Sequence, residues 1–370
     1  MTRRLLILFA LVALLIVSLA ACANSSTTST IAPTTTTAST SVSSRPSAGT
    51  TISSPSTRQL PTTAGPGPTS PQSPASSTTQ SPAATTTSSA PAAGEHVVYA
   101  VGDDTEPGME SVSHHLASLI PLPSQGLELF LYLGDVRPSG SPADFQRYDS
   151  IWGGGGRDLR PKTASLIGNH ETGSREAGWI PYWSGKLVTP WPGSLTQTSS
   201  PYYTVKLGTW KFIILDTTSS LASGSPQYNF LVRELKEPGY RCIVCGHYPR
   251  WSNGLHGDDS DLDAAWKAMC DYGAVAYLSG HDHGSQVQPE RNGDGAVVPS
   301  GGCIQLIAAA GGAPLYPFLS GPGHAAATWR DDTHYAILRL TLRQNDFVAD
   351  FIGEDGTILH SQTFALGAAK

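Results

Sequence analysis

Short apolar runs alternate with amphipathic segments along residues 95–370 of the chain. The apolar runs are rich in Val, Ile, Leu and aromatic residues and are bounded by Gly, Pro or Asp, which predicts β-strands. Strands are expected at 96–101, 127–133, 163–167, 202–207, 210–216, 241–246, 273–279, 303–310, 334–342, 346–353 and 357–364. Apolar positions with helical spacing predict helices over 109–119, 142–149, 226–236 and 261–271.

The order of these elements indicates the fold class. Strands and helices alternate through most of the region, and the last three strands follow one another with turn residues between them, as in an antiparallel meander. Such an order predicts an α/β (α+β) domain. In this domain two mixed β-sheets pack face to face with flanking helices, which gives a four-layer αββα sandwich.

Five of the predicted strands end in the same way, with a buried run, then glycine, then a residue able to bind a metal. The endings are Gly102-Asp103, Gly134-Asp135, Gly168-Asn169-His170, Gly246-His247 and Gly280-His281-Asp282-His283. Glycine permits a tight turn, and sites in open α/β sheets form at the carboxyl ends of the strands. We therefore expect these polar side chains to converge on one point.

The residue types at these endings indicate a metal centre. Carboxylate, amide and imidazole ligands without thiolate suit Zn, Mn or Fe. A carboxylate such as Asp135 can bridge two ions about 3.5–4 Å apart, the spacing used in two-metal phosphate chemistry. A single Gly-Asp at a strand end is usually only a turn, and a single His is usually a surface or core residue. Five such endings in one chain favour the metal centre.

The same motifs resemble those of the calcineurin-like metallophosphoesterase superfamily, in its purple-acid-phosphatase-like bacterial branch. The stretch Pro249-Arg250-Trp251-Ser252-Asn253-Gly254-Leu255-His256-Gly257 adds to the resemblance, which covers about 96–365. The resemblance implies two divalent or mixed-valence metal ions (Fe, Mn or Zn) held by six side chains. These are Asp103 and His283 for the first metal, Asp135 as the bridge, and Asn169, His247 and His281 for the second.

The resemblance also implies catalytic residues and an activity. His170 would sit beside the substrate phosphate and donate a hydrogen bond to the developing charge or the leaving group. His256 lies nine residues after His247 and is not needed as a ligand, so it is a candidate general acid or phosphate ligand, with an ordinary loop histidine as the alternative. The implied enzyme is a metal-dependent phosphoric ester hydrolase that cleaves phosphomonoesters by metal-hydroxide attack. A phosphodiesterase on the same metal core, or a degenerate surface-binding protein without activity, are the alternatives.

Two positions depart from the family pattern. The first motif normally has a His or Gly two residues after its Asp, where this chain has Thr105. In purple acid phosphatases the second motif has a metal-binding Tyr three residues after its Asp, where this chain has Pro138. Water or an unrecognised group such as Asp104 would therefore complete the shell of the first metal, and no tyrosinate-to-iron colour is expected.

The first 94 residues differ from the rest of the chain, because they contain no Asp or Glu. Residues 1–22 combine a basic start, an apolar run and Leu19-Ala20-Ala21-Cys22, which resembles the bacterial lipobox. We expect an exported protein with a lipid anchor at Cys22, attached to the bacterial cell membrane and facing outside the cytoplasm. Residues 23–94, rich in Ser, Thr, Pro and Ala, are expected to be a disordered tether, and 95–370 the metallophosphoesterase domain.

Charge and cysteines add two further expectations. Residues 95–370 carry 29 acidic and 19 basic side chains, so nucleic-acid polymers are not expected as partners. The expected partner is a small-molecule phosphate ester, and the oligomeric state stays open.

Export permits disulfides, with Cys242–Cys270 as the candidate pairing. Cys242 and Cys245 lie in one strand with side chains on opposite faces, which argues against a zinc or redox role.

Overall fold

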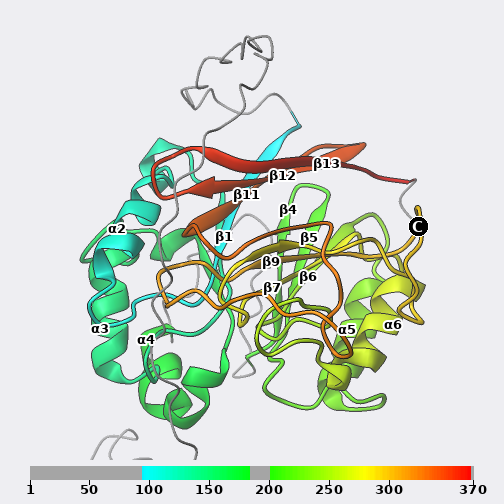
Figure 1. The fold of residues 1–370 in the computed structure, drawn as a ribbon, viewed down its shortest axis with the longest axis horizontal. Helices are drawn as coiled ribbons and strands as arrows, with labels where there is room; N and C mark the ends of the chain where they lie inside the picture. The colour runs from blue at the N-terminus through cyan, green and yellow to red at the C-terminus, as the bar shows by residue number, and fades with distance from the viewer. Residues whose placement is uncertain (1–93, 184–200, 368–370) are drawn as a thin grey trace, which may run out of the picture. The chain divides into compact units, whose positions relative to one another are not determined.

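The computed structural model describes residues 94–183 and 201–367. These residues form two β-sheets with helices on their outer faces (Figure 1). One sheet has the strand order β13-β12-β11-β1-β2-β3 and the other β10-β8-β9-β7-β6-β5-β4. The predicted fold class, two mixed sheets with flanking helices, is confirmed.

The first sheet combines three parallel strands with an antiparallel meander. Its strands are β1 (His96–Val101), β2 (Leu129–Tyr132), β3 (Thr163–Ser165), β11 (Ala336–Leu342), β12 (Asp346–Gly353) and β13 (Ile358–Ala365). β1, β2 and β3 are parallel neighbours, whereas β11, β12 and β13 pair antiparallel. The parallel strands bring their carboxyl ends to one edge of the sheet, where the predicted ligands follow.

The second sheet has four parallel strands in its centre. Its strands are β4 (Tyr203–Leu207), β5 (Trp210–Ile214), β6 (Arg241–Cys245), β7 (Ala276–Ser279), β8 (Ser285–Val287), β9 (Ile304–Ala308) and β10 (Trp329–Asp331). β5, β6, β7 and β9 pair in parallel, and β4, β8 and β10 join antiparallel. β8 and β10 were not expected, because neither contains an apolar run of its own.

Helices cover the outer face of each sheet. They are α2 (Glu110–Ser118), α3 (Pro142–Ile151), α4 (Ile180–Trp183), α5 (Pro226–Leu235) and α6 (Asp263–Asp271), with short 3₁₀ turns at Pro123–Gln125, Arg160–Lys162, Asn169–Ser174 and Ser260–Leu262 and a π-helical turn at Arg175–Trp179. α2, α3 and α4 lie on one side of the two sheets, and α5 and α6 on the other (Figure 1). α3 and α5 each begin with a serine cap followed by proline, the pattern expected at a helix start.

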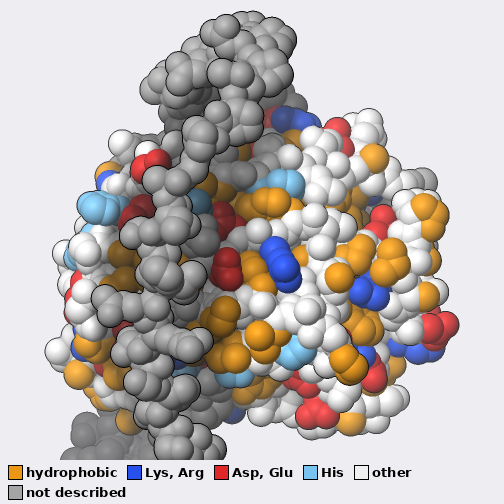
Figure 2. All heavy atoms as spheres, viewed as in Figure 1, with side chains coloured by type: hydrophobic (Ala, Val, Ile, Leu, Met, Phe, Trp, Pro, Cys, Tyr) orange, Lys and Arg blue, Asp and Glu red, His pale blue; other side chains and the backbone are white. Residues whose placement is uncertain are grey.

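Alternating side chains along the strands build the layers. In β1, Val98 and Ala100 point into the core between the sheets, whereas Tyr99 and Val101 pack under the helices of the first sheet. The second sheet repeats this arrangement, with Ile243 of β6 in the shared core and its neighbours under α5 and α6. The result is the four-layer arrangement, in which the predicted ligands stand in the loops at the strand ends. On the face seen in Figure 2, Lys and Arg side chains lie scattered among acidic and apolar ones.

The expected Cys242–Cys270 pairing is wrong, because all four cysteines of the described residues are free. The sulfur of Cys270 lies 3.5 Å from the carbonyl oxygen of Arg291, and Arg291 pairs with Cys303 through two backbone hydrogen bonds. The end of α6 therefore places Cys270 beside the segment that carries Cys303. Cys242 and Cys245 do lie on opposite faces of their strand, in separate apolar clusters.

The predicted signal peptide with its lipobox (1–22) and nearly all of the tether (23–94) lie outside the described residues. Within the parts of the chain that the structure describes, no helix has the length and apolar character needed to cross a membrane.

Candidate metal centre

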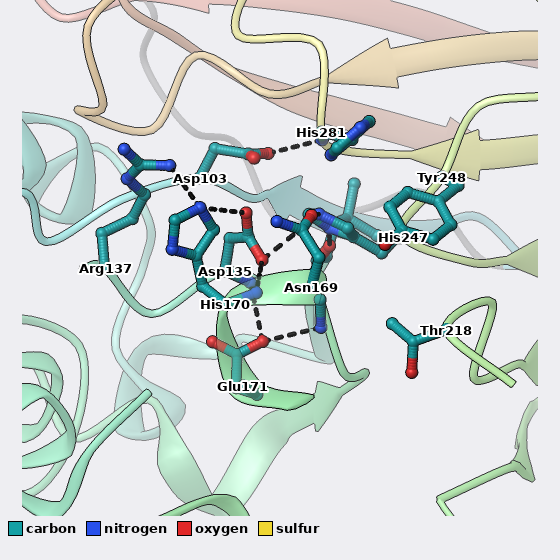
Figure 3. A network of polar contacts seen from close by, with 12 residues as sticks. Asp103, Asp135, Arg137, Asn169, His170, Glu171, Thr218, His247, Tyr248 and His281 are labelled. Atoms are coloured by element: carbon teal, nitrogen blue, oxygen red, sulfur yellow. Dashed lines mark hydrogen bonds and ion pairs between the residues drawn. The ribbon is translucent and has the colours of Figure 1, made fainter. Parts of the chain in front are cut away.

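The predicted ligands lie together at the carboxyl ends of the strands (Figure 3). Asp103 follows β1 and Asp135 follows β2, while His247 follows β6 and His281 follows β7. Donor atoms of Asp135, His247 and His281 all lie within 4.8 Å of one another. Side chains from both sheets therefore meet at one point, as the shared strand endings predict.

Asp135, Asn169 and His247 form the most compact part of the cluster. Nε2 of His247 lies 3.3 Å from Oδ1 of Asp135 and 3.0 Å from Oδ1 of Asn169. Nδ1 of His247 donates a hydrogen bond to the carbonyl oxygen of Leu133 at 2.8 Å. That bond fixes the ring and leaves Nε2 as its ligand atom, the usual arrangement of metal-binding histidines.

Asp103 and His283 form the other side of the cluster. Nε2 of His283 lies 3.5 Å from Oδ1 of Asp103, and Nδ1 of His283 donates to the carbonyl oxygen of Pro314 at 2.7 Å. Oδ2 of Asp103 accepts the backbone N–H of His281 at 2.9 Å. Oδ1 of Asp103 is buried and has no hydrogen-bond partner among the described residues. Because a buried carboxylate oxygen needs a partner, these residues fit a cation.

A glycine precedes each of the strand-end ligands, and at Gly134 the structure shows why a larger residue would not fit. A Cβ atom there would lie 2.8 Å from the backbone nitrogen of Gly168 and 2.9 Å from Nδ1 of His247. Such distances are too short for a side chain, so only glycine lets the loop after β2 approach the loops after β3 and β6. Gly134 also has a φ of 90°, which glycine adopts without strain.

The ionisable groups of the cluster are arranged to receive positive charge. Burial raises the pKa of Asp103 well above its usual range. Burial lowers the pKa of His247, but the carboxylates of Asp135 and Asp103 outweigh it and raise that pKa to about 10. Burial lowers the pKa of His281 to about 2 and that of His283 to about 4. Two histidines are thus held neutral, the form that binds metals, and a cation would displace the proton that the carboxylates of Asp135 and Asp103 stabilise on His247.

Glu171 supports the cluster without belonging to it. Its buried carboxyl group accepts the backbone N–H of Asp135 at 3.0 Å and that of Gly168 at 2.6 Å, and it also accepts the backbone N–H of Val136. These bonds hold the loop after β2 against the loop after β3. Glu171 stands within the Gly168-Asn169-His170-Glu171 motif, but the spacing alone assigned it no role.

His256 lies on the open side of the cluster. Its ring stacks on that of His281, with centroids 4.2 Å apart and an angle of 27° between the planes. Its backbone N–H donates to Oδ1 of Asp282 at 2.8 Å, which fixes the loop that carries it. Its side chain is exposed. The structure brings His256 to the cluster, and its role as general acid or phosphate ligand stays a prediction.

Tyr316 was not found from the sequence. Its ring stacks on that of His283, with centroids 4.0 Å apart and planes at 9°, and meets the ring of His256 edge-on at 5.6 Å. Tyr316 follows a Gly- and Ala-rich loop after β9, and no pattern in that loop points to the site. It forms an aromatic wall beside the ligands.

His170 and Arg137 lie together beside Asp135 (Figure 3). Nε2 of His170 is 3.6 Å from Oδ2 of Asp135 and 2.7 Å from Nη1 of Arg137. His170 thus lies next to the proposed bridging carboxylate, and its role beside a substrate phosphate stays a prediction. Arg137 had no role in the sequence-based prediction.

The suggestion that Asp104 completes the first metal shell is wrong. Its carboxyl group bonds the hydroxyl group of Tyr132 at 2.5 Å, and Tyr132 belongs to the apolar cluster under the helices of the first sheet. Asp104 thus points to the opposite side from Asp103. Thr105 and Pro138, the two departures from the family pattern, leave the first metal with Asp103, Asp135 and His283 as its predicted protein ligands.

The two-sheet sandwich of this chain places carboxylate, amide and imidazole groups at the ends of its strands. Residues 105–285 match the family model described as calcineurin-like phosphoesterase. Residues 105–285 are therefore similar to calcineurin-like phosphoesterases, and the matched segment contains every predicted site residue except Asp103.

Similar proteins support this assignment. Tartrate-resistant acid phosphatase type 5 of Mus musculus is 29% identical over 163 residues, which cover 37% of this chain and 47% of the mouse protein. The Homo sapiens protein of the same name is 41% identical over 61 residues, or 16% of this chain and 19% of the human protein. The matched segments thus span about half or less of these relatives.

Two solved structures share the fold. The purple acid phosphatase PPD1 from yellow lupin (Lupinus luteus) seeds has a TM-score of 0.56 at 17% identity, covering 73% of this chain and 54% of the lupin chain. GAP50, described as the anchor in the inner membrane complex of Plasmodium, also has a TM-score of 0.56 at 17% identity, covering 75% of this chain and 90% of that chain.

Proposed function

We propose that this protein is a metal-dependent phosphoric ester hydrolase that acts on phosphomonoesters outside the cytoplasm. The observation that carries the proposal is the meeting of Asp135 and His247, from different sheets, with Nε2 and Oδ1 3.3 Å apart. Acid phosphatases among the similar proteins support the reaction class.

The proposed centre holds two divalent or mixed-valence ions (Fe, Mn or Zn). Asp103 and His283 would bind one, Asn169, His247 and His281 the other, and Asp135 both. Ions bound there supply a Lewis acid for the phosphate and a water of lowered pKa as the nucleophile. The chain's own residues would orient the ester, with His170 and Arg137 beside Asp135 and with His256 and Tyr316 stacked on His281 and His283.

A second candidate function is binding without catalysis on the same fold. Thr105 and Pro138 favour it, since both depart from the family pattern within the metal-binding motifs. GAP50, which shares the fold, is described as an anchor. A phosphodiesterase on the same metal core is a third candidate, because the walls of the site decide between the two kinds of ester.

Turnover measurements separate these candidates. The purified chain would be loaded with Mn, Zn or Fe and assayed with an aryl phosphomonoester and the matching aryl phosphodiester. We expect metal-dependent turnover with the monoester preferred, and a loss of at least about 10³-fold in kcat for Asp135→Asn, because the proposed shared ligand is lost. Asp271→Asn, which removes a half-exposed carboxylate paired with Lys267 on α6, is the matched control and should keep full activity. Folded protein without turnover under any metal would favour the binding protein.

A further inference from the structure

We propose that Arg137 binds the phosphate group of the substrate and selects dianionic phosphomonoesters over monoanionic phosphodiesters. This inference rests on the proposed function and deepens it, because it names the charge state of the substrate. It also assigns His170 as a positioning residue that acts through Arg137.

Both the guanidinium group and the backbone of Arg137 are held in place by hydrogen bonds. Nε donates to Oε2 of Glu106 at 2.7 Å, and Nη1 lies 2.7 Å from Nε2 of His170. The carbonyl oxygen of Arg137 accepts from Nη1 of Arg147 at 3.1 Å. Only 16% of the side chain is exposed. Arg137 is thus a preorganised charge and not a loose surface arginine.

The hydrogen bonds of His170 decide which group donates to a substrate. Nδ1 of His170 lies 2.5 Å from the carbonyl oxygen of Pro138, which can only accept, so Nδ1 carries the proton. Nε2 then accepts from Arg137. In this arrangement both ring nitrogens of His170 are engaged, and the donor beside the proposed bridging Asp135 is the guanidinium group.

The position of Arg137 suits an anion in front of the metal ligands. His170 stands between Arg137 and Asp135 (Figure 3), and the charge of Arg137 also acts on Asp103 and His283. A guanidinium group has five N–H donors, and the contacts described above occupy two of them. Its planar fork matches two oxygens of a phosphate group.

The charge of Arg137 explains the expected selectivity. A phosphomonoester dianion carries twice the charge of a phosphodiester monoanion, and Coulomb attraction to a fixed cation scales with that charge. A monoester also offers three unsubstituted oxygens, whereas a diester offers two. Removing Arg137 should therefore lower kcat/KM much more for monoesters than for diesters.

The test compares both esters in the full chain, as wild type, Arg137→Ala and Arg137→Lys. We expect Arg137→Ala to lower kcat/KM for the aryl monoester by about 10²–10³-fold and that for the matching diester by less than about tenfold. Inhibition by inorganic phosphate should weaken by at least about tenfold. Arg137→Lys should recover part of the monoester rate, because it restores the charge without the fork. Arg160→Ala, which removes an arginine paired with Asp149 away from the site, should change neither ester.

The positioning role of His170 has its own readout. His170→Ala should reduce the ratio of monoester to diester turnover, as Arg137→Ala does, and His170→Gln should restore it, because the amide oxygen can accept from Arg137. If His170 had only a structural role, His170→Ala would lower the turnover of both esters equally and leave their ratio unchanged.

The outcomes keep this inference separate from the proposed function. A wild-type chain that hydrolyses neither ester under any metal contradicts the proposed function. A wild-type chain that turns over, combined with an unchanged ester ratio and unchanged phosphate inhibition in Arg137→Ala, contradicts only the role of Arg137. If Arg137→Ala fails to fold, Arg137→Gln decides, because it removes the charge and keeps a polar side chain; an unchanged ester ratio in that variant would contradict the role of Arg137.

Discussion

Three of the predicted metal ligands have backbone conformations that residues other than glycine rarely adopt. Asp103, Asp135 and His281 have φ values of 61°, 65° and 75°. Each such residue costs about 1–3 kcal/mol, and strained residues cluster at functional sites. At Asp135 the surrounding hydrogen bonds enforce the conformation, since its N–H binds Glu171 and its Oδ1 accepts the N–H of His170. The site therefore stores strain to aim its ligands.

The close approach at Gly134 predicts a specific mutational effect. Gly134→Ala would force a Cβ atom against Gly168 and His247, so we expect lower stability, loss of bound metal and at least about a 10²-fold loss of activity. Gly108→Ala is the matched control, because Gly108 has the same φ of 90° but nothing within 4 Å of its Cβ position. The control should cost only the left-handed strain of about 1–2 kcal/mol. Equal effects in urea unfolding and metal content for the two variants would contradict the steric explanation.

The sequence predicts the convergence of Asp135, His247 and His281 better than it predicts the surroundings of these side chains. Each ligand follows a strand and a glycine, and that pattern is local, so Asp135 or His247 can be found without knowing the fold. The direction of Asp104 and the role of Arg137 depend on contacts with distant segments, such as Tyr132 and Glu106. No local spacing encodes such contacts.

At the scale of elements, helix α3 shows how a single carboxyl group anchors a loop beside the site. Oδ2 of Asp144 accepts backbone and hydroxyl groups of Ser139 and Ser141, with distances of 2.8–3.2 Å. Oδ1 accepts from Nη1 of Arg147 at 3.1 Å, and Arg147 also binds the carbonyl oxygen of Arg137. The start of α3 is thus linked to the loop that carries the proposed phosphate-binding residue.

Asp144→Asn should therefore destabilise the domain in a pH-dependent way. Burial raises the pKa of Asp144, but hydrogen bonds from Ser139, Ser141 and Arg147 outweigh it and lower the pKa below its usual value. A lowered pKa in the folded state stabilises the protein above the unfolded pKa of about 3.9 and loses this contribution as the pH falls further. We expect Asp144→Asn to cost about 1–3 kcal/mol at pH 7 and progressively less below about pH 4. Urea unfolding at pH 7 and pH 3.5 measures the difference, and an equal cost at both values would contradict it.

The sequence predicts some of the strands and helices but not others. Strands with a continuous apolar run, such as β1, β6 and β9, could be predicted because each is buried between layers. β8 and β10 could not, since their residues are polar or partly exposed and they exist as strands only through pairing with β9 and with each other. The contact of Cys270 with the Cys303 segment was missed for the same reason, because it depends on how α6 packs.

At the scale of the whole molecule, the N-terminal region suggests where the domain works. We propose that the chain is exported and anchored by a lipid at Cys22, with residues 23–94 as a tether that holds the domain away from the membrane. The proposal rests on Leu19-Ala20-Ala21-Cys22 and on the absence of acidic residues from the first 94 positions.

Fractionation of bacterial cells that express the chain tests this location. The wild-type protein should sediment with membranes and take up labelled fatty acid, because acylation at Cys22 supplies the anchor. Cys22→Ser should take up no label and leave the membrane fraction. Cys270→Ser, which removes a thiol of the folded domain, should behave as wild type. An unlabelled wild-type chain would contradict the lipid anchor.

The central claim is that residues from distant parts of the chain hold two cations around Asp135. Anomalous diffraction from crystals of the metal-loaded protein, collected at the absorption edge of the bound element, measures this directly. The account predicts two peaks about 3.5–4 Å apart, one on each side of Asp135, with His247 beside one and His283 beside the other. No peak at Asp135, or a single ion bound elsewhere, would contradict it.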